Sequence, residues 1–107
     1  MSTFLKNVKL DLTSTGVTTL YTTPAAKTAV FKSILVSEDS GSADTITVTI
    51  TDASAAVFSL FKVKAVAANT TVELLSQPLV VETSEILKFT AATANRLHVV
   101  ASYMELG

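Results

Sequence analysis

The stretch "DTITVTITD", from Asp44 to Asp52, alternates between two kinds of side chain and constrains the fold more than any other segment. Successive side chains of a β-strand point to opposite faces of the sheet, so one face carries threonine and the other carries branched apolar residues. The threonines are Thr45, Thr47, Thr49 and Thr51. This alternation predicts a half-buried strand, and the apolar segment "AAVFSLF" that follows predicts its hairpin partner.

The rest of the chain repeats this pattern in short segments separated by turn residues. Valine, isoleucine and threonine dominate, and these β-branched residues suit a pleated sheet better than a helix. Gly16, Pro24 and Pro78 mark breaks between segments. The expected strands cover residues 7–13, 17–22, 28–38, 45–52, 56–64, 70–75, 79–82, 86–91 and 96–106, where 79–82 and 86–91 form one interrupted strand or two short ones. About eight strands at this spacing predict an all-β sandwich or barrel.

The length of 107 residues suits a single domain that covers residues 1–107. A hydrophobic core can form at this size without a metal or a disulfide. Met1 to Lys6 precede the first expected strand, and they are interpreted either as an N-terminal arm or as ordinary terminal disorder. In the first interpretation, Phe4 and Leu5 reach onto a neighbouring molecule.

Charged residues are scarce in this chain. They make up 16% of the sequence, against about 25% in typical domains, while hydrophobic residues make up 49%. The net charge of -1 gives no basic surface for phosphates, so we expect no nucleic-acid partner. No apolar run approaches the roughly 18 residues of a membrane helix, and "MSTFLKNVKLDL" does not resemble a signal peptide, so we expect no membrane partner. We predict that other proteins cover part of the surface.

Residue patterns that indicate catalysis are weak. His98 is the single histidine, and it lies inside the last expected strand without a nucleophile motif nearby. Glu82 and Glu85 have the residue types of a glycosidase pair, but the segment "ETSE" is more simply a solvated bend. The chain has no cysteine, and its three glycines are scattered, which excludes thiol chemistry and a glycine-rich phosphate loop. We predict that the chain is not an enzyme and binds no cofactor.

Two binding functions stay open. The turn "EDSGSAD" brings together Glu38, Asp39 and Asp44, but it lacks the ligand spacing of a helical calcium loop. It is therefore either an irregular ion site or a solvated turn. A carbohydrate-binding module is the alternative from another functional class, although there is no tryptophan and only Tyr21 and Tyr103 as tyrosines to stack on a sugar.

Two long segments carry a resemblance to a known group of proteins. The first, from Leu20 to Asp52, contains "YTTP" and an alternating strand pair around "EDSGSAD". The second, from Ala67 to Leu106, contains "VELL", "LVVETSEILKF" and "VVASYMEL". Together they resemble small virion structural proteins of tailed bacteriophages. The resemblance implies a single-domain antiparallel β-sandwich of jelly-roll type that acts as an oligomer. The shared pattern concerns the fold, so no binding residue is carried over.

This resemblance predicts a capsid decoration or cement subunit that stabilises the phage head at junctions of major capsid proteins. The alternative within the same class is a tail, fibre or adaptor component. The expected location is the virion, assembled in the host cytoplasm. The expected partners are further copies of the chain, with a trimer favoured, and the major capsid protein or other virion proteins. The predicted interface residues are Phe4, Leu5, Thr45, Thr47, Thr49 and Thr51.

Overall fold

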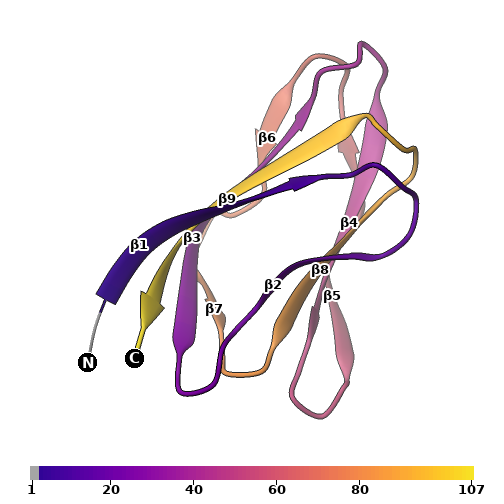
Figure 1. Cartoon of the computed structure of the whole chain (residues 1–107). Coiled ribbons are helices and arrows are strands. Elements are labelled where there is room, and N and C mark those ends of the chain that lie inside the picture. The colour runs from indigo at the N-terminus through magenta and orange to yellow at the C-terminus, as the bar shows by residue number, and fades with distance from the viewer. Residues whose placement is uncertain (1–2) are drawn as a thin grey trace.

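The computed structural model describes residues 3–107, which form two antiparallel β-sheets packed face to face (Figure 1). Met1 and Ser2 lie outside the described residues. Sheet A has the strand order β1-β9-β3-β6, with β7 also paired to β3, and sheet B has the order β2-β8-β4-β5. The strands are β1 (Thr3–Asp11), β2 (Thr18–Thr22), β3 (Thr28–Glu38), β4 (Asp44–Thr51), β5 (Val57–Val66), β6 (Thr71–Glu73), β7 (Leu79–Val81), β8 (Ile86–Ala91) and β9 (Leu97–Leu106).

This strand order is that of a jelly roll, in which two Greek keys distribute the strands over two sheets. The chain crosses between the sheets at most connections, and β4 and β5 form a hairpin within sheet B. The predicted all-β, single-domain sandwich is therefore confirmed. Within residues 3–107, no helix is long and apolar enough to span a membrane.

β6 and β7 act as one interrupted strand, because they pair with opposite halves of β3. Pro78 lies in the interruption and has no amide hydrogen to donate to a ladder. Glu73 fills part of the gap with its side chain, since its carboxylate accepts a hydrogen bond from the Ile34 amide at 2.7 Å. The Leu74 amide donates to the Ile34 carbonyl at 2.9 Å. Segments 79–82 and 86–91 are two strands in different sheets, which decides between the two predicted arrangements.

The hydrophobic core lies between the two sheets and consists of the inward-facing residues of each alternating strand. Tyr21, Phe31 and Tyr103 form an aromatic cluster at one end of the core, with ring centroids 4.8–5.3 Å apart. The fully buried apolar residues from the central strands include Phe31, Ile34, Val36, Ile46, Val48, Leu87, Phe89, Val99 and Ala101. Packing both inner faces into this layer fixes which face of each strand remains outside.

The N-terminal segment differs from the prediction of an arm. Thr3–Lys6 belong to β1 and pair with the end of β9, so the first strand begins four residues before the predicted start at Asn7. Lys6 interrupts the apolar pattern in the sequence, but its ammonium binds the Glu105 carboxylate at 3.1 Å and so fits the strand. The arm interpretation is therefore wrong for residues 3–6, and residues 1–2 lie outside the described part.

Candidate interaction surfaces

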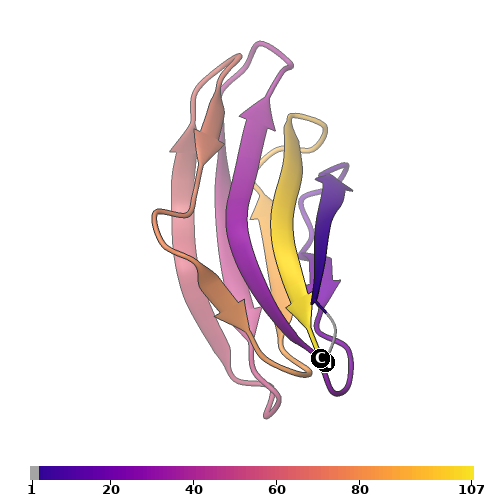
Figure 2. The same ribbon diagram turned by 90° about the vertical axis from the view of Figure 1, so that its left-hand side faces the viewer.

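The outer face of sheet A, toward which Figure 2 looks, carries four apolar side chains in a row across the sheet. Leu5 in β1 pairs with Met104 in β9. Met104 also pairs with Val30 in β3, which in turn pairs with Val80 in β7. Directly paired residues of antiparallel strands point to the same side of the sheet. Leu5 and Val80 are 81% and 51% exposed, and the other two are half-buried. We call this set the apolar row.

A second row on the same face has apolar residues at its centre and opposite charges at its ends. Its order is Lys9 in β1, Val100 in β9, Leu35 in β3 and Glu73 in β6. Burial raises the pKa of Glu73, but hydrogen bonds from Ser33 and from backbone amides outweigh it, so the pKa is lowered overall. The carboxylate therefore stays charged near neutral pH. We call this set the mixed row.

Polar residues separate the two rows. Asn7, Ser102 and Ser33 lie in register between them. Lys32 sits at a β-bulge in β3 and lines a pocket with Leu5, Asn7 and Ser102. Apart from Lys32, the centre of this face has apolar or hydroxyl side chains rather than charges.

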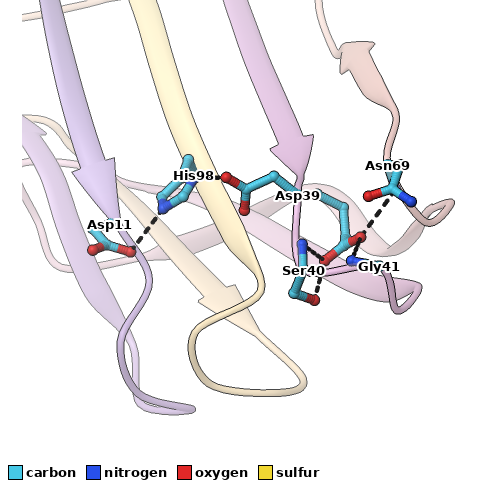
Figure 3. Close-up of polar contacts among 7 residues, drawn as sticks. Asp11, Asp39, Ser40, Gly41, Asn69 and His98 are labelled. Carbon is cyan, nitrogen blue, oxygen red and sulfur yellow. Dashed lines mark hydrogen bonds and ion pairs between the residues drawn. The ribbon is translucent and has the colours of Figure 1, made fainter.

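His98 lies on the same outer face, beyond the mixed row, between two carboxylates (Figure 3). Its Nε2 is 3.3 Å from an oxygen of Asp11, and its Nδ1 is 3.6 Å from an oxygen of Asp39. All three side chains are well exposed to solvent. The arrangement links β1, β9 and the turn after β3. Ser37 of β3 is the residue paired with His98, and among the described residues no hydrogen bond joins its hydroxyl to the imidazole.

Glu38 organises the turn "EDSGSAD" from inside. Its side chain is buried, with 2% of the residue exposed. The carboxylate accepts hydrogen bonds from the Ser40 hydroxyl and from the amides of Ser40, Gly41 and Asn69, at 2.8, 3.1 and 3.0 Å for the amides (Figure 3). These hydrogen bonds, that of the Ser40 hydroxyl first, lower the pKa of the carboxyl from 4.5 to about 2. Glu38 is therefore an anionic anchor for two loops.

The positions of Glu38, Asp39 and Asp44 argue against an irregular ion site in this turn. Glu38 directs its carboxylate to loop amides, Asp39 directs its own toward His98, and Asp44 accepts from the Thr93 amide at 3.1 Å. The three carboxylates thus serve three different partners. Within residues 3–107, no group of three or more histidine, aspartate or glutamate side chains is arranged to hold a metal ion. The solvated-turn interpretation accounts for Asp39, and Glu38 has a structural role that the sequence pattern did not indicate.

The four predicted threonines of β4 do not form a uniform surface. Thr45 and Thr49 are half-buried on sheet B, while Thr51 is buried, with 7% exposed, and its hydroxyl has no hydrogen-bond partner in the described part of the chain. The Thr47 hydroxyl accepts a hydrogen bond from the Val63 amide at 3.1 Å. It thereby holds a bulge of the edge strand β5 in place, so Thr47 has a role within the sheet.

Phe4 and Leu5 are both exposed, but alternation puts them on opposite faces of β1. Phe4 lies on the side of the inward-facing Lys6, whose ammonium is 5.8 Å from the Phe4 ring. Behind it, the Glu105 carboxylate binds the Lys6 ammonium at 3.1 Å and the Tyr21 hydroxyl at 2.7 Å. The Tyr21 hydrogen bond, followed by that of Lys6, lowers the pKa of Glu105. Only Leu5 of the two predicted residues belongs to the apolar row.

The tyrosines and the paired glutamates have structural positions. Tyr21 and Tyr103 are buried in the aromatic cluster, so neither offers a ring face to a sugar. The Glu82 amide donates to the Glu85 carboxylate at 2.8 Å, which closes the turn between β7 and β8. These contacts favour the solvated-bend interpretation of "ETSE" over an acid–base pair.

The apolar row was not found from the sequence, apart from Leu5. Met104, Val30 and Val80 are single outward positions in strands whose inward positions are equally apolar. Each strand then resembles a fully buried one, and the row appears only when four distant segments are set in register. One feature of the sequence does indicate an apolar outer face. In β3 and β9, apolar residues occur on both faces of the strand, so apolar and polar side chains alternate poorly.

Comparison with known proteins gives a structural likeness but no match in sequence. No protein-family model matches the chain, and no curated protein matches it. Among solved structures, a chain described under "Bacillus endospore appendages form a novel family of disulfide-linked pili" superposes with a TM-score of 0.58. The match covers 97% of this chain and 87% of that chain, at 10% sequence identity. At this identity the likeness shows a shared fold.

Proposed function

We propose that this chain is a structural subunit that works by binding copies of itself and other proteins within a larger assembly. The apolar row on the outer face of sheet A carries the proposal. A sheet face that meets only water usually presents polar residues, whereas an apolar centre with a charged rim is the composition of a protein interface. Leu5, at 81% exposure, is the clearest member of this surface.

At the finer level, we propose a capsid decoration subunit located in the virion. Three observations support this assignment. The chain resembles small phage virion proteins between Leu20 and Leu106, it folds as a jelly roll, and its charged residues are scarce at 16%. Decoration requires a folded module that adds buried area only in the assembled shell, so that binding stabilises the shell by mass action.

A subunit of a filament or tail is the second candidate, and the structural likeness favours it. The endospore appendage protein is described as forming disulfide-linked pili. The 107 residues of this chain contain no cysteine, so a comparable assembly would depend on non-covalent contacts alone. The apolar row and the mixed row are surfaces that such contacts require.

Gold-labelled antibodies against the chain, applied to particles from the organism that produces it and viewed by electron microscopy, test both candidates. Dense labelling over capsid heads is expected for decoration. Labelling confined to tails or filaments would replace the first candidate with the second. Particles and filaments that remain unlabelled would contradict the structural role, and specific binding on a glycan array would then favour the carbohydrate-binding module.

A further inference from the structure

We propose that the outer face of sheet A binds the same face of a second copy of this chain, about a two-fold axis parallel to the strands between β9 and β3. This inference rests on the proposed function and deepens it by naming the partner and the symmetry. The evidence is the order of side chains along the apolar row and the mixed row, because each order is complementary to its own reverse.

A half-turn about this axis keeps every residue at its level along the strands and reverses the strand order. β1 then lies opposite the β6–β7 strand of the second copy, and β9 lies opposite β3. In the apolar row, Leu5 faces Val80 and Met104 faces Val30 of the second copy. Four apolar side chains from each copy thus meet at one level.

The mixed row gives the charge complementarity. At the level of the backbone, the same half-turn places Lys9 opposite Glu73 of the second copy, and symmetry repeats this pair on the other side. The Glu73 carboxylate also accepts hydrogen bonds from Ser33 and from the Ile34 amide of its own chain, so Lys9 would reach an anion that is already held in place. Val100 and Leu35 face each other between the two pairs. The interface then has an apolar centre and oppositely charged rims. Lys32 is the charged side chain nearest the centre, and its long chain lets the ammonium reach water.

An axis perpendicular to the strands is less favourable. Placed midway between the two rows, it would exchange them, so that Leu5 would face Lys9 and Val80 would face Glu73. Burying these charges against apolar groups costs free energy, because no opposite charge would compensate for the lost hydration. A three-fold axis does not bring a face against itself, so this surface predicts a dimer rather than the trimer expected from the sequence.

The size of the face suits a dimer that dissociates on dilution. Strands lie about 4.8 Å apart and rise about 3.3 Å per residue, so four strands of nine residues, the length of β1, cover roughly 570 Å² per copy. The total of roughly 1,100 Å² is near the lower end of specific interfaces. Packed sheets cross at about -30°, so the match is best at the four central residues, which are Met104, Val30, Val100 and Leu35.

Light scattering coupled to size exclusion tests the proposal on three proteins. Val30→Lys places a charge at the centre of the face, and Thr45→Lys is its matched control on β4, a central strand of sheet B, at a similarly half-buried outward position. Over about a hundredfold range of concentration, wild type and T45K are expected to form dimers. V30K is expected to bind itself roughly 30-fold more weakly or worse.

Leu5→Lys covers the case in which V30K does not fold, because Leu5 is highly exposed on an edge strand. A wild type that stays monomeric throughout would overturn the proposal. Dimers that survive both V30K and L5K would also overturn it, since they must form through another surface, such as the edge of β1. Antibody-labelled particles together with a monomeric chain would refute the dimer alone. If the chain forms the dimer but the antibodies label no particle, the proposed function is refuted and the dimer is not.

Discussion

The outer faces of the two sheets differ in a way that their strands, taken singly, do not reveal. Sheet A presents the apolar row and the mixed row, each built from four strands. In sheet B, the outward threonines Thr45, Thr47 and Thr49 come from the one strand β4. The edge strand β5 of the same sheet carries the exposed apolar residues Val57, Phe58 and Val63. Threonine hydroxyls remain hydrated or bind backbone groups, whereas valine, leucine and methionine gain free energy only when another surface covers them.

The difference shows which kind of interaction surface can be recognised in the sequence. A threonine face within one segment is conspicuous in the sequence, but it has an explanation inside the monomer, as the Thr47 contact with Val63 shows. The apolar row has no such explanation, because its members point away from the core. If the outer face of sheet A binds another copy while the threonines of sheet B stay in water, substitutions on the two sheets should have different effects.

Substitutions of two adjacent residues of β3 are expected to differ most in their effect on folding. Phe31 is fully buried in the aromatic cluster, and Val30 points outward beside it. Phe31→Ala is expected to lower the free energy of unfolding by about 3–5 kcal/mol. Val30→Ala is expected to lower it by less than about 1 kcal/mol. Urea unfolding of dilute protein measures both, and equal losses would mean that the outer face serves the fold of the single chain.

The polar network behind the apolar row predicts a smaller effect. Tyr21 donates a hydrogen bond to Glu105, a buried carboxylate next to Met104 in β9. Tyr21→Phe is expected to lower the free energy of unfolding by about 1–3 kcal/mol, because the carboxylate loses a buried donor. Met104→Leu, which changes the outward neighbour, serves as the control with little expected loss. A stable Y21F protein would show that Lys6 alone satisfies the carboxylate.

Two adjacent acids at the end of β3, the buried Glu38 and the exposed Asp39, predict the pH dependence of stability. Glu38 has a pKa of about 2 in the folded chain against 4.5 as its ordinary value, so its charged form stabilises the fold. That contribution is present above about pH 4.5 and is lost as the pH falls toward 2. Glu38→Gln is expected to unfold more easily near neutral pH and to lose this part of the acid dependence.

Asp39→Asn is the matched control for Glu38→Gln, because Asp39 is exposed and contacts His98. The thermal midpoint of each protein, measured from neutral to acidic pH, gives the comparison. If the two variants show the same acid dependence as wild type, the Glu38 hydrogen bonds do not stabilise the folded chain.

The threonine face predicts the smallest effects. Thr45→Ala and Thr49→Ala are expected to change the free energy of unfolding by no more than about 0.5 kcal/mol and to leave the dimer mass unchanged. Thr47→Ala is expected to cost more, because the Val63 amide loses its acceptor. Unfolding curves and light scattering check both statements. Loss of the dimer in T45A or T49A would mean that the threonines of β4 form the interface, as the sequence predicts.

The sequence was sufficient for the fold because the alternation is local. The strand that contains Ile46 and Val48 was recognised from its own residues, and Pro24 and Pro78 marked real breaks. The start of β1 was missed because Lys6 resembles a solvent-exposed interruption until its partner Glu105, at the other end of the chain, is in place. Local patterns therefore predict strands, while pairings between distant residues decide where they begin.

The candidate site was less predictable for the same reason. Glu38 resembled a solvated turn residue, and its burial depends on the Asn69 amide from a separate loop. Val30, Met104 and Val80 each resembled core residues, since a single strand does not show which face a sheet turns outward. Register across the sheet supplies that information, and it is set by the whole jelly roll.

The most direct test of this account compares the two outer faces in one sample. Methyl NMR with an inert paramagnetic co-solute reports how accessible each methyl group is to solvent, at low and at high protein concentration. The account predicts that the methyls of Val30 and Met104 become shielded as the concentration rises, while those of Thr45 and Thr49 stay accessible. Shielding of the threonine methyls alone, or of neither set, would contradict the assignment of sheet A as the self-association surface.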